Sequence, residues 1–410
     1  MNAVLRPASA TPGAPGVDAA FLADPYPAYA AWRAAGPVQW SEDFFGGAWL
    51  LTRNAEVDAA LRDPCLSARR TGGWVMQGAA ERAGLQGFQR LFARAMLFVD
   101  APDHPRLRRA MQAGFGAGAL QRLAPSIAKR VDARLDAVDP GAGFDFIAAL
   151  ARPLPAEVIG LVLGLPEADA EAVAASEALA DFIGSPRPEP GQARSAQRAL
   201  LALVRRIEPV IAERRHAPGD DLVGRLVQAQ ADGGVADTTE LLAQCAMLLF
   251  AGHETTRHLL GTAMATFAAD PALWQRLRRE PARLPAALRE VLRHDSPVQY
   301  TGRRVTADRV LHGQTLRRGD LVLALIGSAN RDPARHADPD RFDPDRAAGP
   351  PLSFGAGAHA CIGAGLTLME ATLVFERLLQ RLPRPELVGA PRRVASTLYR
   401  GYASLRVRSA

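Results

Sequence analysis

The sequence predicts one large, mainly α-helical domain with a small β portion. Helical apolar periodicity recurs along most of the 410 residues, strand candidates are few and short, and no linker or charge run divides the chain after residue 20. Hydrophobic residues make up 48% of the chain, which is ample for a core. We therefore expect a single domain over residues 21–410, preceded by a disordered tail over residues 1–20.

The composition of the chain argues against several classes of protein. Three cysteines at unrelated spacings do not form a disulfide framework, so a reducing, cytoplasmic location fits. No run of 18 apolar residues and no signal peptide is found, so we expect no membrane association. The net charge is +6, but the basic residues are spread beside 43 acids, which argues against nucleic acid as a partner. A local basic face for an acidic protein partner stays open.

The first hundred residues combine short elements with a long loop. We expect a helix in 21–35 opened by Pro25, a strand at 47–52 and a helix at 54–63, with Cys65 in the turn that follows. Residues 67–100 are poorly patterned but carry bulky apolar side chains, which is typical of a functional loop. Ordinary core packing explains any one of these side chains about equally well.

Helices dominate the middle of the chain. His104 and Arg108 are four residues apart, so on a helix they share one face that could bind an anion or simply be solvated. Glu290 and Arg293 are three apart and can form an ion pair. Further helical patterns cover 118–166, 167–184, 191–215, 222–229, 238–269 and 284–294, and short strands are expected between 309 and 322.

The pattern at 238–269 predicts the longest helix, capped by Thr238 or Thr239 and almost entirely apolar in its middle. Glu254 and Thr255 interrupt this apolar stretch. A buried acid beside hydroxyl groups is costly unless it is paired or used. An internally capped acid in a kinked helix is the alternative.

Residues 354–363 read F-G-A-G-A-H-A-C-I-G and precede a predicted helix at 364–379. Cys361 would thus lie at a helix N-terminus, where amide N–H groups and the helix dipole lower the pKa of a thiol. A thiolate in such a loop suits iron as a soft ligand. For Cys65 and Cys245 we expect only a small buried hydrophobe.

This loop resembles the haem-binding loop of the cytochrome P450 family, in which the cysteine is the proximal thiolate ligand of the haem iron. The string A-G-H-E-T-T at 251–256 is similar to that family's oxygen-activation motif. Five motifs occur in family order over about residues 20 to 408. The resemblance implies a cytochrome P450 fold with one haem b between the distal (I-type) helix at 238–269 and the proximal (L-type) helix at 364–379.

The resemblance also implies a role for individual residues. Cys361 would be the metal ligand, and Thr255 and Glu254 would deliver protons during oxygen activation. His104, Arg108 and Arg303 would hold haem propionates, with Arg304 a close competitor of Arg303. The haem loop would add Phe354, Gly355 and His359. The substrate pocket would include Trp74, Met76, Phe98, Ala251, Gly252, Val298, Tyr300, Thr397 and Leu398. A structural triad would consist of Glu290, Arg293 and Arg341.

The implied activity is a monooxygenase that inserts one oxygen atom from O2 into an apolar small molecule. The chain has no flavin or iron–sulfur motif, so electrons from NAD(P)H would come through a separate ferredoxin and its reductase, to a monomeric enzyme. Oxidative phenol coupling, a peroxygenase and a non-catalytic haem-thiolate sensor are the alternatives. The Glu254–Thr255 pair argues against the last two. One departure from many bacterial members, Leu-Thr-Leu at 366–368 in place of Leu-Ala-Arg, puts in doubt a partner contact through that arginine.

Overall fold

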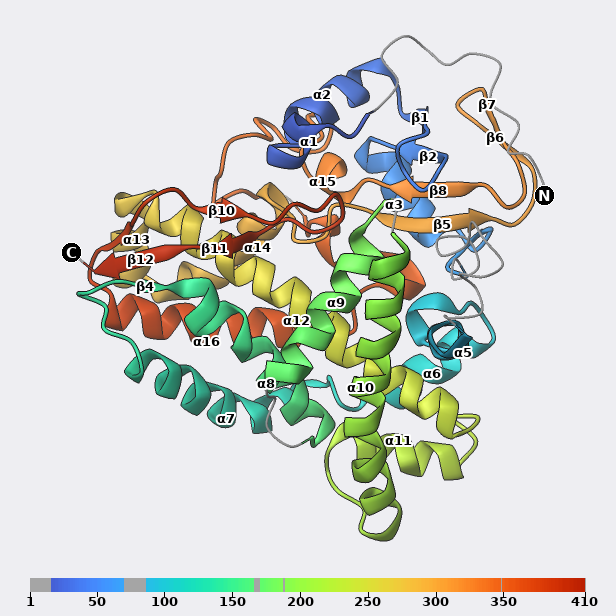
Figure 1. Cartoon of the computed structure of the whole chain (residues 1–410). Helices are drawn as coiled ribbons and strands as arrows, with labels where there is room; N and C mark the ends of the chain where they lie inside the picture. The colour runs from blue at the N-terminus through green and yellow to red at the C-terminus, as the bar shows by residue number, and fades with distance from the viewer. Residues whose placement is uncertain (1–15, 70–85, 166–169, 187–188, 348, 410) are drawn as a thin grey trace.

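Most of the chain is helical and its strands are short, which confirms the predicted class (Figure 1). The computed structural model describes residues 16–69, 86–165, 170–186, 189–347 and 349–409. The helices are α1 (Ala19–Ala23), α2 (Tyr26–Ala35), α3 (Asn54–Arg62), α5 (Gln86–Phe92), α6 (Asp103–Gln112), α7 (Ala117–Asp136), α8 (Pro153–Leu163), α9 (Ala170–Gly184), α10 (Pro190–His216), α11 (Leu222–Ala231), α12 (Thr238–Ala268), α13 (Pro271–Arg279), α14 (Leu284–His294), α15 (Ile326–Ala329) and α16 (Ala364–Arg381). Single turns are η1 (Met96–Phe98), η2 (Ile147–Ala151), η3 (Pro281–Arg283), η4 (Leu352–Phe354) and η5 (Gly357–His359).

The strands form small sheets. They are β1 (Val38–Ser41), β2 (Ala48–Leu51), β3 (Leu66–Ser67), β4 (Phe144–Asp145), β5 (Thr301–Val305), β6 (Arg309–Leu311), β7 (Gln314–Leu316), β8 (Leu321–Ala324), β9 (Pro385–Leu387), β10 (Arg392–Arg393), β11 (Tyr402–Ser404) and β12 (Arg406–Ser409). The largest sheet has the order β1-β2-β8-β5-β3, with β2 and β8 parallel and its other pairs antiparallel. In it, Arg303 pairs with Val322 and Arg304 with Leu321.

The N-terminal region differs from the prediction in its boundaries. The Asp18 side chain accepts a hydrogen bond from the Phe21 amide at 2.7 Å and caps α1, so helix begins inside the predicted tail. Two helices, α1 and α2, replace the single predicted one, because Pro25 starts a second helix. The predicted tail at 1–15 and the loop at 70–85, with Trp74 and Met76, lie outside the described residues.

Helix α12 runs through the middle of the molecule and packs against α8, α9, α10, α14 and α16 (Figure 1). Its N-cap is Asp237, whose side chain accepts from the Glu240 amide at 2.8 Å. The predicted Thr238 and Thr239 are instead the first residues of the helix. Nearly every side chain of α12 is buried, as expected for a helix that is apolar all round.

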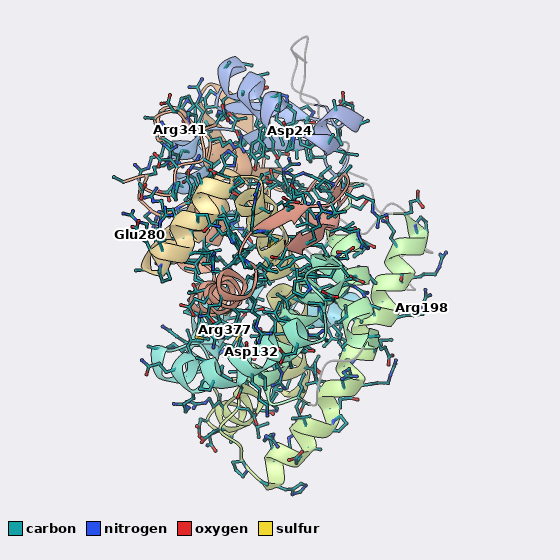
Figure 2. The ribbon with its side chains drawn as sticks, turned by 90° about the vertical axis from the view of Figure 1, so that its left-hand side faces the viewer. Asp24, Asp132, Arg198, Glu280, Arg341 and Arg377 are labelled. Carbon is teal, nitrogen blue, oxygen red and sulfur yellow. The ribbon has the colours of Figure 1, made fainter. Side chains whose placement is uncertain are left out.

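Helices α9 and α10 pack on each other and cover one side of α12. The connection between them ends at Pro190, the first residue of α10, and Glu189 and Gln192 form a capping box there. Figure 2 shows α10 at the edge of the molecule, with Arg198 pointing away from the body.

The predicted triad is corrected in its third member. Arg293 donates to both carboxylate oxygens of Glu290, at 2.8 and 2.7 Å, and both residues are buried. The third guanidinium is that of Arg346, whose Nε donates to Glu290 Oε1 at 3.3 Å. Arg341 contributes its main-chain carbonyl, which accepts from Arg293 and Arg346, while its side chain lies on the outer surface (Figure 2).

One stretch of the described chain, 357–381, is long and apolar enough to cross a membrane when judged by length and composition alone. Its main part, α16, packs against α7, α12, α13 and α14 and buries Phe375 and Leu378 completely. A single stretch of this kind is weak evidence for a membrane span.

Candidate active site

A cavity of about 310 Å³ lies between α12, β5 and the loop that precedes α16. Its wall is mostly apolar, and Glu254 is the one carboxylate among the described residues that line it. Of the residues predicted for the site, those in this wall are Phe98, His104, Arg108, Ala251, Glu254, Thr255, Val298, Tyr300, Arg303, Phe354, Gly355, His359, Cys361 and Leu398. The fold thus brings together residues that are up to 300 positions apart in the sequence, from Phe98 to Leu398.

The loop that holds Cys361 is fixed by main-chain contacts. The Cys361 amide donates to the Phe354 carbonyl at 2.7 Å, and Arg108 Nη1 donates to the Ala360 carbonyl at 2.8 Å. Gly357 has φ +69°, and a Cβ added there would lie 2.8 Å from the Leu61 carbonyl oxygen. Glycine is therefore required at this turn.

Burial raises the pKa of the Cys361 thiol, which contradicts the predicted lowering. The thiol lies deep inside the molecule, and its exposed surface is cavity wall. The amides of Gly363 and Ala364 and the charge of Arg108 lower its pKa, as the sequence suggested, but desolvation outweighs them. A bound metal cation would supply the charge that favours the thiolate.

The other two cysteines differ from each other. Cys245 is completely buried in α12, as predicted. Cys65 is exposed, which corrects the prediction, because it lies in a surface turn where its amide donates to the Asp63 side chain.

Cationic and donor side chains gather on the cavity wall beside this loop. The rings of His104 and His359 lie 4.1 Å apart, measured between their centroids. Burial, with the charge of Arg108, lowers the pKa of His104, and its Nε2 atom is buried without a hydrogen-bond partner among the described residues. Together with Arg303, these groups place nitrogen donors of the kind that an anionic group requires on the wall of an apolar cavity.

The geometry of β5 gives the side chains of Arg303 and Arg304 different surroundings. Neighbouring side chains in β5 point to opposite faces of the sheet. Arg303 is buried and lines the cavity, where its Nη1 donates to the Gly302 carbonyl at 2.9 Å. Arg304 donates to the Gly319 carbonyl at 2.9 Å and is not part of the cavity wall.

Across the cavity, α12 presents Ala251, Glu254 and Thr255. The Thr255 hydroxyl donates to the Ala251 carbonyl at 3.0 Å, one turn back along the helix. Gly252 does not line the cavity, which corrects the prediction. A Cβ added to Gly252 would lie 2.9 Å from Ile159 Cγ1, so this glycine permits close packing of α12 on α8.

Glu254 is buried, and desolvation raises its pKa to about 7. Its Oε1 lies 3.2 Å from His253 Nδ1, and its Oε2 lies 3.5 Å from His258 Nε2. His253 faces away from the cavity, as expected, with its Nε2 2.7 Å from the Arg152 carbonyl. At neutral pH the Glu254 carboxyl is therefore poised between its two protonation states.

Comparison with known proteins gives the same family throughout. The Cytochrome P450 family model matches residues 192–383. Cytochrome P450 107B1 of Saccharopolyspora erythraea is 36% identical over 399 residues, which cover 95% of this chain and 96% of that protein. The chain belongs to the cytochrome P450 family. Erythromycin C-12 hydroxylase of the same organism is 35% identical over 356 residues, 86% of this chain and 85% of that protein. The structure of the tirandamycin C-bound P450 monooxygenase TamI superposes with a TM-score of 0.85, at 33% identity, over 96% of this chain and all of that chain.

This cytochrome P450 is a haem-thiolate monooxygenase that uses haem b, O2 and electrons derived from NAD(P)H, supplied by redox partners, to oxidise a small-molecule substrate. The described residues fit the cofactor. A cysteine faces the cavity, donors for carboxylates lie beside it, and a buried His104 nitrogen lacks a partner. When bound, haem b supplies the iron at which O2 is activated.

Of two predicted pocket residues that contact each other in this P450, Tyr300 lies where it was predicted and Thr397 does not. Tyr300 lines the cavity, and its hydroxyl lies 3.0 Å from the Thr397 hydroxyl. Thr397 lines a neighbouring cavity instead. The sequence analysis did not name Met247 and Leu248, which line the main cavity. Counting back two helical turns from Thr255 would have found them, because positions seven and eight residues away share its face of α12.

Proposed function

We propose that Cys361 is the proximal ligand of the haem iron and that His104, Arg108, Arg303 and His359 hold the haem propionates. The position of the thiol in the cavity wall and the donors around it support this assignment. Phe354 and Gly355 would shape the loop beneath the ring. The single observation that carries the proposal is the convergence of Cys361 and these donors on one apolar cavity.

Thr255 and Glu254 would deliver the protons that oxygen activation consumes. Both line the cavity, and the Glu254 pKa of about 7 lets this carboxyl give and regain a proton near neutral pH. The Thr255 hydroxyl, which donates to the Ala251 carbonyl at 3.0 Å, would turn toward the cavity for this step. Much of the remaining wall is apolar, so these two side chains would control proton supply.

The substrate would be an apolar small molecule that is hydroxylated at a C–H bond. Apolar side chains such as Met96, Phe98, Met247 and Leu398 form much of the wall and support this class. A relative is named erythromycin C-12 hydroxylase, and the TamI structure holds tirandamycin C, so compounds of these two kinds are the first to test. Product masses would separate hydroxylation, which adds oxygen, from phenol coupling, which removes hydrogen.

We further propose a single domain over residues 21–410 that acts as a cytoplasmic monomer with a separate ferredoxin and reductase. One hydrophobic cluster contains residues from Phe21 to Val407, which supports one domain. Turnover by the purified chain with NAD(P)H alone would contradict the separate partners.

The deciding experiment is the absorption spectrum of the reduced, carbon monoxide-bound protein. We expect the red-shifted Soret band of a thiolate-ligated haem, and its loss in Cys361→Ser. Cys65→Ser is the matched control, because Cys65 is an exposed thiol away from the cavity. A spectrum that Cys361→Ser leaves unchanged would overturn the assignment of the ligand.

A further inference from the structure

One amide side chain lies in the apolar part of α12 that leads to the main cavity. Every residue of the stretch 241–251 is hydrophobic except Gln244. Gln244 is completely buried and lines the cavity. A buried amide has lost its contacts with water, so it is costly unless both its nitrogen and its oxygen have partners. The partners of Gln244 therefore indicate what this side chain does.

Both polar ends of the Gln244 side chain bind the main chain of another segment. Its Oε1 accepts a hydrogen bond from the Met96 amide at 2.8 Å, and its Nε2 donates to the Arg94 carbonyl at 2.8 Å. Nε2 also donates to the Glu240 carbonyl at 2.9 Å, which holds the side chain against its own helix. Gln244 thus binds the two main-chain groups on either side of Ala95 and fastens them to α12.

The single turn η1 follows this contact directly, and its three residues all line the cavity. The Phe98 amide donates to the Ala95 carbonyl at 2.8 Å, so the turn begins at the residue that the Gln244 contacts flank. Beyond the turn, the Asp100 side chain accepts from the Ala68 amide at 2.9 Å. This part of the cavity wall therefore lies between two anchors, and Gln244 provides the one on α12.

Gln244 shares one face of α12 with Asp237 and Glu240, because these positions are three and four residues apart. Each of the three contacts the segment from Arg94 to Arg106. Asp237 pairs with the Arg94 side chain, and Glu240 accepts from Arg106 at 2.7 and 2.8 Å. Asp237 and Arg94 are about half exposed, at 48% and 43% of their side-chain surface. Of the three contacts, that of Gln244 alone holds the main chain at the start of η1.

We propose that Gln244 is a positioning residue that fixes the wall formed by η1 and thereby determines how closely the cavity encloses an apolar substrate. The two hydrogen bonds hold Met96 and Phe98 against the cavity, and without them this part of the wall would move. Both polar ends of the amide are engaged, so Gln244 would act on the substrate through the wall. The inference rests on the proposed function, because it concerns the pocket in which that substrate would be oxidised.

The test compares two ligands of the ferric, haem-loaded protein. Imidazole is small and binds the haem iron through nitrogen. N-dodecylimidazole binds in the same way and also places a long apolar chain along the wall. The shift of the Soret band gives the dissociation constant of each. Because the added chain has no hydrogen-bonding group, a change in its contribution reports the shape of the wall and not a direct hydrogen bond to Gln244.

Gln244→Met keeps the length of the side chain and removes both hydrogen bonds to the segment. We expect it to weaken the binding of N-dodecylimidazole about fivefold or more and to leave imidazole within about twofold of the native protein. In parallel, hydrogen–deuterium exchange of the peptide that covers 94–98 should become faster, because the Met96 amide loses its acceptor. The spectrum of the reduced, carbon monoxide-bound variant shows that its haem site is intact.

Two further variants separate positioning from a general loss of structure. Gln244→Glu, measured at about pH 6, should restore the native affinity, because burial keeps its carboxyl protonated and able to accept from Met96 and to donate to a carbonyl. Arg94→Ala is the matched control. It removes the largely exposed ion pair with Asp237 and keeps the main-chain contact of residue 94 with Gln244, so both affinities and the exchange rate should stay unchanged.

Three results would overturn the inference: unchanged binding of N-dodecylimidazole by Gln244→Met, equal losses for both ligands, or the same loss in Arg94→Ala. Failure of the proposed function is read separately. If the native protein shows no binding of imidazole to a thiolate-ligated haem, the proposed haem site is wrong and the inference falls with it. If the native protein binds both ligands and Gln244→Met has no effect, only the positioning role is refuted.

Discussion

The Nε atom of Arg346 lies 3.3 Å from the Oε1 atom of Glu290 and joins a loop of the chain to the buried ion pair on α14. The Asp343 amide donates to the same oxygen at 2.8 Å. Glu290 thus fastens residues 343–346 to α14, in the part of the chain that leads to the haem-binding loop.

We predict that Glu290→Ala lowers the free energy of unfolding by about 3–5 kcal/mol, because Arg293 would remain buried without its carboxylate. Arg346→Ala should cost less, about 1–3 kcal/mol, since Glu290 keeps Arg293. Arg341→Ala is the control and should stay within about 0.5 kcal/mol. Urea denaturation of the haem-loaded proteins measures all three, and an Arg341 effect as large as that of Arg346 would contradict the network.

Substitution of Arg303, with its neighbour Arg304 as the control, tests which arginine contributes to haem binding. Arg303→Ala should speed haem loss about tenfold or more, because one charge-assisted hydrogen bond is worth roughly 1.5–3 kcal/mol. Arg304→Ala should have little effect, since its side chain bonds to Gly319 outside the cavity. The measurement is the rate of haem transfer to an apo-globin acceptor. Equal rates for the two variants would refute the assignment of Arg303.

Thr255→Ala should keep haem and substrate binding but divert electrons from product to hydrogen peroxide, because the proton supply to the cavity is cut. Product and peroxide formed per NAD(P)H consumed give the effect. Thr256→Ala is the control, since Thr256 faces Thr367, at 3.5 Å between hydroxyls, and does not line the cavity. Coupling that Thr255→Ala does not change would rule out this role.

Glu370 is buried in α16, its Oε1 has no partner among the described residues, and desolvation raises its pKa well above the usual value. A raised pKa in the folded state means that the native protein holds its proton where the unfolded chain releases it. Stability then falls as pH rises above the unfolded value near 4.5, by up to about 1.4 kcal/mol per pH unit.

Glu370→Gln keeps the shape without a titrating proton and should remove this dependence. The variant should therefore gain stability over the native protein as pH is raised from 5 to 8, whereas at pH 4 the two should be close. Thermal unfolding at a series of pH values tests this. A difference that stays constant with pH would show that Glu370 is ionised in the fold.

The sequence by itself determined the class of fold, the long helix at 238–268, the helix that begins at Ala364 and the tight turn at Gly357 before Cys361. Each of these depends on local signals. Helical periodicity indicates which face of a helix is buried. The glycines before Cys361 indicate a turn with positive φ, a backbone conformation that other residues rarely adopt.

Only the tertiary structure decided which side chains meet. In the fold, Arg303 and not Arg304 lines the main cavity, and the side chain of Arg346, not of Arg341, binds Glu290. Gly252 packs against Ile159, and Thr397 lines the neighbouring cavity. It also raised the pKa of the Cys361 thiol, where the local pattern predicted a lowering. Contacts and desolvation arise between segments far apart in the chain, and a local pattern carries no information about them.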